Sequence, residues 1–132
     1  MKKLTIWLAL CMLLLLGGCG EKQPSAFEIH KHDVVGTWQM VSRTDQNGTV
    51  TDTLGEKVFF TYTVDGKGEK TIDGKTEYTL TFSYDGKQLY TTAQYIQTEE
   101  THLRNDLCTV TGDSMTIFSY DENTTVTLKK VS

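Results

Sequence analysis

Between residues 36 and 131 the chain alternates between apolar and polar residues, with the period of two that is typical of half-buried β-strands. The clearest segment is 77–84, where apolar side chains fall on one face of an extended chain and threonine or serine on the other. Phe60, Tyr62 and Val64 alternate with threonines in the same way. The pattern predicts eight or nine short strands, at residues 36–44, 49–53, 57–64, 67–72, 75–84, 87–98, 102–111, 114–120 and 124–131.

Asn-Gly and Asp-Gly pairs separate several of these segments, at residues 47–48, 65–66, 73–74 and 85–86. Both pairs are preferred in two-residue hairpin turns, because the central residues of such turns need positive φ. Short turns in sequence order predict an all-β antiparallel meander, closed into an up-and-down barrel of about eight strands. We favour the barrel because closure leaves no unpaired strand edges. The alternative is a two-sheet β-sandwich.

The first eighteen residues break this alternation. Lys2 and Lys3 precede an almost uninterrupted apolar run from residue 4 to residue 16, and two glycines follow it. A charged start, a short apolar centre and small residues at the end are typical of an export signal. The run is too short to span the ~30 Å hydrocarbon core comfortably, since a spanning helix needs about 20 residues. We therefore predict that residues 1–18 form a signal peptide.

The sequence Leu16-Gly17-Gly18-Cys19 resembles the lipobox of bacterial lipoproteins. In that class a signal peptidase cuts before the cysteine, whose sulfur carries a diacylglycerol. The resemblance implies that Cys19 is lipidated and that acyl chains such as palmitate attach the protein to a membrane of the cell envelope, facing the periplasm or the exterior. Two or three chains on one residue make such an anchor stable. The alternative is an ordinary cysteine at the end of an uncleaved anchor helix.

The residues after the signal have an acidic balance. Without Lys2 and Lys3 the chain keeps 11 basic and 17 acidic side chains, a formal charge of −6. Nucleic acid or an anionic lipid surface needs a basic face, and the sequence has no Lys/Arg cluster. We therefore expect no nucleic-acid partner, and membrane attachment through the lipid on Cys19. Residues 19–33 are predicted to be the lipidated cysteine and a tether, and 34–132 a single domain.

Gly36-Thr37-Trp38 stands at the start of the first predicted strand, after two valines. This Gly-x-Trp resembles the motif with which lipocalins and the shorter bacterial lipocalin-like domains commonly begin. The resemblance implies an eight-stranded barrel in which Trp38 closes one end. It also implies that a basic side chain late in the last strand, Lys129 or Lys130, packs over that tryptophan. Gly36 is part of the same expected packing at the barrel end.

A barrel of eight strands either fills itself with side chains or keeps room for one small ligand. Tyrosine suits a ligand site because it has an apolar body and a hydrogen-bonding tip. We predict that the barrel binds or carries a small apolar or amphipathic ligand, with candidate contacts at Trp38, Tyr62, Tyr78, Phe82 and Tyr84. The alternative for these residues is ordinary core packing. The alternative function is a protein-interaction or inhibitor-like envelope module without a small-molecule ligand.

The sequence shows no motif for catalysis. Cys108 is the single cysteine predicted to stay thiol in the domain, because Cys11 lies in the signal. On one strand Cys108 and His102 would lie roughly 20 Å apart, at ~3.3 Å per residue, so they form no dyad. A role as a small buried hydrophobe suits this thiol better. We therefore expect a binding protein and not an enzyme.

Two further groups offer polar chemistry. His30, His32 and Asp33 supply imidazole and carboxylate side chains that are suitable metal ligands. A closed metal site needs more ligands than this segment holds, so we expect neither a metal nor another cofactor. Arg43 and Arg104 are the only arginines. Either can hold a ligand carboxylate at a barrel mouth, or be a solvated charge at a strand edge.

Overall fold

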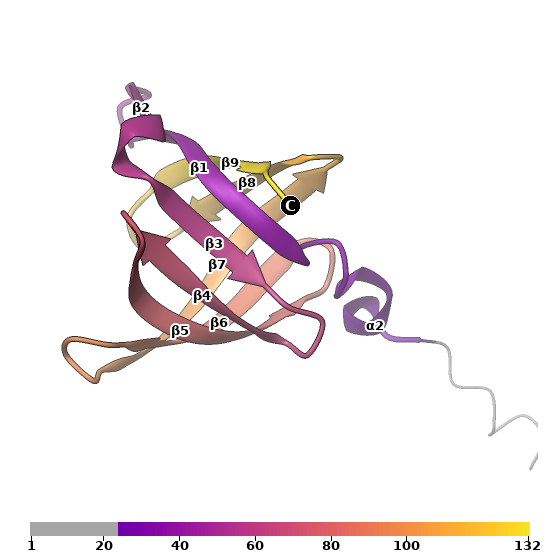
Figure 1. Cartoon of the computed structure of the whole chain (residues 1–132). Coiled ribbons are helices and arrows are strands. Elements are labelled where there is room, and N and C mark those ends of the chain that lie inside the picture. Colours follow the sequence, from indigo (N-terminus) through magenta and orange to yellow (C-terminus); the bar gives the residue numbers. More distant parts are fainter. Residues whose placement is uncertain (1–23) are drawn as a thin grey trace, which may run out of the picture.

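The protein is described here by a computed structural model that covers residues 24–132; the predicted signal peptide and Cys19 lie outside the described residues. Within that part a short helix, α2 (Ala26–His30), precedes nine strands (Figure 1). No helix among the described residues is both long enough and apolar enough to cross a membrane. The strands are β1 (Gly36–Thr44), β2 (Val50–Asp52), β3 (Val58–Tyr62), β4 (Lys67–Ile72), β5 (Lys75–Tyr84), β6 (Gln88–Tyr95), β7 (Thr101–Thr111), β8 (Ser114–Ser119) and β9 (Thr124–Lys130).

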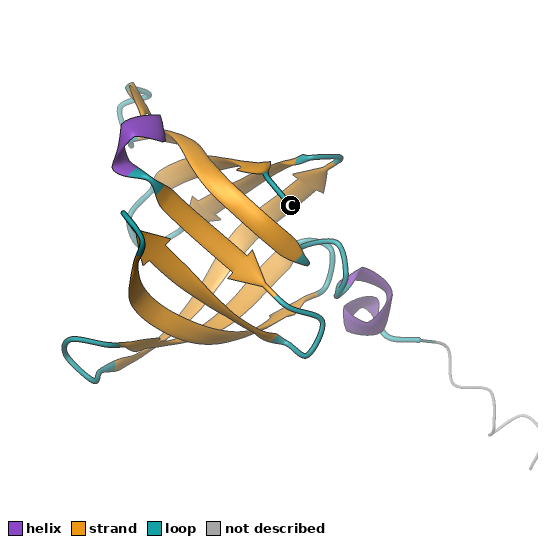
Figure 2. Cartoon of the chain, in the orientation of Figure 1, coloured by secondary structure: helices purple, strands orange, loops and turns teal. Residues whose placement is uncertain are grey.

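The strands form one closed antiparallel barrel. From β3 to β9 each strand pairs with its neighbour in sequence, and β1 pairs with both β3 and β9. Figure 2 shows the ring that these pairings close. The predicted all-β, lipocalin-like meander barrel of about eight strands is therefore confirmed, and the two-sheet alternative is wrong because the β1–β9 ladder joins the two ends of the sheet.

β2 is the strand beyond the eight of the barrel. Residues 50–52 of β2 pair with residues 42–44 of β1, and residues 59–62 of β3 pair with residues 36–39 of the same strand. Both therefore run along one edge of β1, separated by the 3-10 turn η1 (Leu54–Glu56). Thr53 enters this turn, is fully buried, and donates its backbone N–H to the carbonyl of Val41 at 3.2 Å. The segment after β1 thus pairs with β1 twice, first as β2 and then, after η1, as β3. Only β3 is part of the closed ring.

The core lies inside the barrel, on the inward positions of the alternating strands. All the strand ladders and all the buried apolar side chains lie between Val34 and Ser132. Because this region holds its own closed sheet and core, residues 20–132 fold without the segment before them. The buried apolar residues are Val34, Trp38, Met40, Val58, Phe60, Tyr62, Tyr78, Leu80, Tyr84, Leu89, Ala93, Cys108, Met115, Ile117 and Leu128.

Two sequence predictions at strand ends are wrong. Val64 was expected on the inward face of a strand reaching residue 64, but β3 ends at Tyr62 and Val64 is 68% exposed in the turn to β4. A turn begins there instead, since Thr63 donates both its backbone N–H and its hydroxyl to the Lys67 carbonyl and accepts from the N–H of Gly66. The predicted strand 87–98 likewise ends at Tyr95, where Glu99 donates its N–H to the Tyr95 carbonyl. Alternation alone does not show where a turn begins.

Candidate functional site

One end of the barrel is closed by Trp38. Its side chain is fully buried, and its indole N–H donates to the carbonyl of Val34 at 2.9 Å. Directly across the β1–β9 ladder, the Nζ of Lys130 lies 5.7 Å from the centroid of the Trp38 ring. Lys129 is exposed and pairs in the ladder with Gln39. The structure thus places Lys130, and not Lys129, over the tryptophan.

Gly36 occupies a position at this closed end that leaves no room for a side chain. Its φ is +139°, which residues other than glycine rarely adopt. A Cβ built there would lie 2.7 Å from Cε of Lys130 and 2.8 Å from the backbone oxygen of Ser132. The structure therefore explains both defined residues of the Gly-x-Trp segment. The C-terminus passes close to Gly36, and Trp38 fills the closed end of the barrel.

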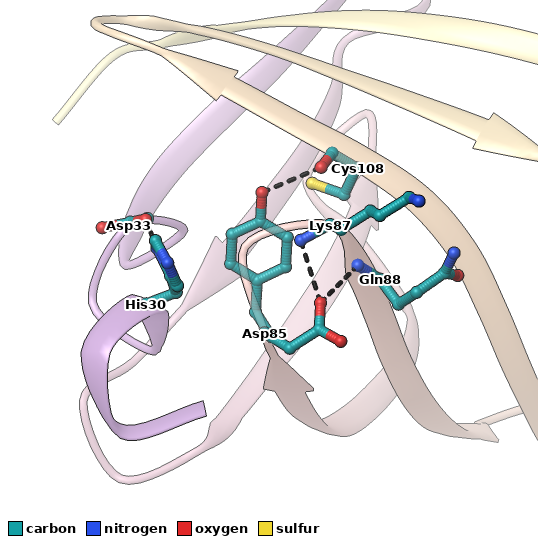
Figure 3. A network of polar contacts seen from close by, with 7 residues as sticks. His30, Asp33, Asp85, Lys87, Gln88 and Cys108 are labelled. Carbon is teal, nitrogen blue, oxygen red and sulfur yellow. Dashed lines mark hydrogen bonds and ion pairs between the residues drawn. The ribbon is translucent and has the colours of Figure 1, made fainter. Parts of the chain in front are cut away.

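Helix α2 lies against the same end of the barrel (Figure 1). The His30 ring packs on Gly86, where an added Cβ would come within 2.7 Å of it, and edge-on against Tyr84 with 6.4 Å between centroids. Its Nδ1 lies 2.8 Å from a carboxylate oxygen of Asp33 (Figure 3). This contact thus keeps the His30 and Asp33 side chains next to each other. Residues 24–132 contain no cluster of three or more His, Cys, Asp or Glu side chains placed to bind a metal.

Tyr84 and Cys108 fill the barrel beside this end. The Tyr84 hydroxyl donates to the carbonyl of Cys108 at 2.8 Å. The Cys108 side chain is itself buried, and burial raises the pKa of its thiol to about 12. His102 lies elsewhere, near the β6–β7 loop, 3.1 Å from Glu100. Cys108 is therefore a neutral thiol without a neighbouring base.

The other half of the barrel encloses a cavity of about 300 Å³. We call this cavity the lumen, and the barrel end at which it opens the mouth. The mouth is opposite α2, where the β4–β5, β6–β7 and β8–β9 turns lie. The lumen lining is mainly aromatic and charged. Its aromatic residues are Phe60, Tyr62, Tyr78 and Tyr95, and its charged residues are Arg43, Lys70, Glu77, Arg104, Asp106 and Glu122.

The lumen receives only two of the five ligand contacts predicted from sequence, Tyr62 and Tyr78. Trp38 and Tyr84 belong to the closed end and do not line it. Phe82 is partly buried, packs edge-on against Tyr62 with 5.1 Å between centroids, and lines shallow depressions elsewhere. All five residues occupy inward positions of their strands, so the alternation does not distinguish them. Their positions along the strands decide which of them line the lumen.

Arg104 and Asp106 form the most buried ion pair of the lumen. The Arg104 Nε donates to Asp106 Oδ2 at 3.3 Å, and its Nη2 donates to the hydroxyl of Ser119 at 3.4 Å. Asp106 is only 6% exposed, and burial raises the pKa of its carboxyl despite the neighbouring guanidinium. Burial alone would lower the pKa of Arg104, but Asp106 and Tyr78 raise it overall. Arg104 is thus a permanent cation inside the barrel.

Lys70 occupies the aromatic part of the lumen. Its Nζ lies 2.9 Å from a carboxylate oxygen of Glu77. The same nitrogen is 5.6 Å from the ring centroids of both Phe60 and Tyr78, within the range of a cation–π contact. At the mouth Arg43 donates to Glu56 at 3.4 Å. Each cation of the lining therefore has an acidic partner.

Two tyrosine hydroxyls in the lumen have no such partner. Tyr62 and Tyr78 are 3% and 5% exposed, and neither hydroxyl makes a hydrogen bond within residues 24–132. Burial raises the pKa of both phenols, so both stay protonated and able to donate. A ligand or water in the lumen can accept these hydrogen bonds.

Sequence reasoning named the arginines and two of the tyrosines, but missed the acids and the lysine of the lumen. Lys70 and Glu77 meet across the β4–β5 hairpin, beside the register shift between Lys70 and Thr71, and the curvature of the barrel brings them to the same cavity as Asp106 of β7. One local signal was present. Arg104, Asp106 and Cys108 alternate along β7, so a charged pair shares a strand face with a buried thiol. Charges on an inward face are a sign of a polar interior.

The comparisons with known proteins add no relative. No family model, no curated protein and no solved structure matches the chain. The fold is that of a lipocalin-like barrel by its own strand order and closure. The chemistry of the lumen is accordingly the basis for a proposed function.

Proposed function

We propose that this protein is a lipid-anchored binding module of the cell envelope, whose lumen holds the polar part of a small amphipathic molecule. The observation that carries the proposal is the half-filled barrel: a closed apolar end, and a cavity of about 300 Å³ lined by tyrosines and ion pairs. Since a water molecule occupies about 30 Å³ in the liquid, a group as large as about ten waters fits. That is a head group and not a whole lipid.

The polarity of the lumen favours an amphipathic ligand over a wholly apolar one. An apolar molecule would displace water from Arg104, Glu77 and the tyrosine hydroxyls without replacing the lost hydrogen bonds. Leaving a buried polar group unpaired costs about 1–3 kcal/mol, and more for a charge. Of the two ligand classes predicted from sequence, the amphipathic one therefore agrees better with the lining.

The place of α2 favours an orientation for the anchored protein. Helix α2, which belongs to the predicted tether, lies at the closed end (Figure 1). The residues that line the lumen lie toward the opposite end. With Cys19 lipidated, the mouth faces away from the point of attachment, toward the periplasm or the exterior. The proposed role is binding and not catalysis, because the one thiol of residues 24–132 is buried with a raised pKa.

Native mass spectrometry tests the proposed binding. The soluble protein, residues 20–132, is mixed with a small-molecule extract of bacterial envelopes and then washed. We expect it to retain a defined species. Thr91 lines the lumen and its neighbour Thr92 points outward, so Thr91→Phe fills the cavity while Thr92→Phe is the matched control. The species should be lost from the first variant and kept by the second. Retention by Thr91→Phe, or no retained species at all, would contradict the proposal.

A second candidate is the protein-interaction module. Several exposed large apolar side chains lie at or next to the connections at this end, namely Val50, Leu54, Ile72, Ile96 and Tyr120. Such a set on neighbouring loops is a feature of interaction surfaces. A stable protein partner captured by residues 20–132 but lost on Ile96→Ser with Tyr120→Ser would favour this candidate. Ile29→Ser, on exposed α2, is the control.

A further inference from the structure

A groove lies beside the lumen at the mouth. It has a volume of about 340 Å³ and runs between the β4–β5 turn and the β6–β7 loop, with Ile72, Gln97 and Thr98 in its walls. Glu77 and Tyr95 line both the groove and the lumen. The two cavities therefore adjoin each other at these two residues.

Tyr95, one of the two shared residues, belongs to a row of aromatic rings. Tyr78 in the lumen lies 4.9 Å from Tyr95 between ring centroids, and Tyr95 lies 5.0 Å from the ring of His102. Ile72, at the end of β4, is an exposed aliphatic side chain beside this row. An apolar chain leaving the lumen thus meets rings and an aliphatic side chain, and gains by covering them.

The head group meets a lumen of balanced charge. The lining holds three cations, Arg43, Lys70 and Arg104, and three acids, Glu77, Asp106 and Glu122. Two of these cations are paired within the lining, Lys70 with Glu77 and Arg104 with Asp106. A charged head would add an uncompensated charge beside these two pairs, which is costly in a desolvated site. A cation would also compete with Lys70, which already occupies the space over Phe60 and Tyr78.

The lumen holds both donors and acceptors that can form further hydrogen bonds. Tyr62, Tyr78 and the N–H groups of Arg104 that Asp106 and Ser119 do not use can donate. Glu77, Asp106 and Glu122 have carboxylate oxygens that can accept. Hydroxyl groups are the ligand groups that use both, since each donates once and accepts twice.

We infer that the ligand is an amphiphile with an uncharged, hydroxyl-rich head such as a sugar in the lumen, and an apolar chain in the groove beside Ile72 and Tyr95. This inference rests on the proposed function and names its ligand class. It reverses the usual arrangement of an apolar ligand inside a barrel, because here the polar end enters first.

Calorimetry with a series of probes tests the class. Residues 20–132 are titrated with octyl glucoside, octanoate, octyltrimethylammonium, octanol and free glucose, all below their micelle concentrations. We expect octyl glucoside to bind at least about tenfold more tightly than each of the others. Equal affinity for octanoate or octanol would overturn the choice of head group, and equal affinity for glucose would overturn the role of the groove.

Variants test where the sugar head and the octyl chain of octyl glucoside bind. Tyr62→Phe removes a hydroxyl without a protein partner, so the fold is kept, and octyl glucoside affinity should fall roughly threefold to tenfold, as one hydrogen bond of ~0.5–1.5 kcal/mol implies. Ile72→Ser should weaken octyl glucoside but not glucose, and Ile29→Ser at the other end should change neither. Undiminished binding of octyl glucoside to Tyr62→Phe or to Thr91→Phe would overturn the placement in the lumen.

The two proposals fail differently. If the envelope extract supplies a species that Thr91→Phe loses, while octyl glucoside shows no preference, the proposed function stands and the ligand class is wrong. If neither the extract nor any probe binds, both are wrong.

Discussion

The two ends of this barrel are built from the same strands but differ in what those strands turn inward. At the closed end the inward side chains include Trp38, Met115 and Leu128, all fully buried. At the mouth they include Lys70 and Arg104, held by acids. The change happens within single strands: along β7 the inward face passes from Arg104 and Asp106 to buried Cys108.

The difference indicates that the closed end stabilises the fold and that the mouth carries polar groups. Burial of large apolar side chains is the dominant source of stability, and the closed end holds the fully buried Trp38, Met115 and Leu128. Ion pairs in a cavity add little stability, because desolvation offsets their attraction. The mouth can therefore carry polar groups while the closed end maintains the fold. Stability measurements at matched positions can break or sharpen this contrast.

Trp38→Ala should have the largest effect. Removal of a fully buried tryptophan costs about 3–5 kcal/mol through lost burial and the cavity left behind. Urea unfolding of residues 20–132 measures the loss. Leu103→Ala, at an exposed position of β7 near the mouth, should change the free energy of unfolding by less than ~0.5 kcal/mol. A similar loss in both variants would remove the contrast.

Gly36→Ala should cost somewhat less, about 2–3 kcal/mol, because its positive φ is strained for alanine and its Cβ would strike the Ser132 backbone oxygen. Gly48→Ala is the control, since φ there is +81° and no atom lies near an added Cβ. That variant should lose only ~1–2 kcal/mol, the backbone strain alone. Equal losses would show that the close approach at Gly36 contributes nothing.

The two buried tyrosines give a smaller and more direct comparison. Tyr84→Phe removes the donor to the Cys108 carbonyl and should cost about 1–2 kcal/mol. Tyr62→Phe removes a hydroxyl without a partner in residues 24–132, so the free energy of unfolding should stay within ~0.5 kcal/mol. Urea unfolding again measures both. A larger loss for Tyr62→Phe would mean that its hydroxyl is structural.

The smallest effect is a pH dependence of opposite sign at the two ends. Burial raises the folded-state pKa of Asp106 in the lumen, so its contribution to stability is present below the unfolded pKa and lost as pH rises through the folded pKa. Hydrogen bonds from the backbone N–H groups of Gln88 and Lys87 lower the pKa of Asp85 at the closed end. Its contribution is present above the unfolded pKa and lost as pH falls through the folded pKa.

Unfolding free energies at several pH values check both signs. Asp106→Asn should remove the part of the profile that declines with rising pH, and Asp85→Asn the part that declines with falling pH. If the Asp106→Asn profile runs parallel to that of the unchanged protein, the carboxyl is not perturbed by burial. The same outcome for Asp85→Asn would mean that its backbone hydrogen bonds do not persist in solution.

Much of the fold could be predicted from local patterns alone. Alternation located all nine strands, and Asp-Gly pairs at residues 65–66, 73–74 and 85–86 marked three of the hairpins. Tyr62, Tyr78, Arg43 and Arg104 of the lumen were also named in advance. Lys70, Glu77 and Asp106 were not, because a charged residue on an alternating strand looks the same whether its face is solvated or enclosed.

The sequence by itself determined where the strands lie and which face most of their side chains take, since these depend on neighbours one to four residues away. It did not determine the strand ends, where Val64 is exposed, or the register shift in β4, beside which Glu77 and Tyr78 both line the lumen. Only the tertiary structure decided which inward positions meet. Closure of β1 on β9 gathered Trp38 and Lys130 at one end and three ion pairs toward the other. Height along the barrel axis depends on strand register and tilt, which are properties of the whole sheet. The position of an inward residue along the barrel axis therefore decides whether it packs in the closed end or lines the cavity.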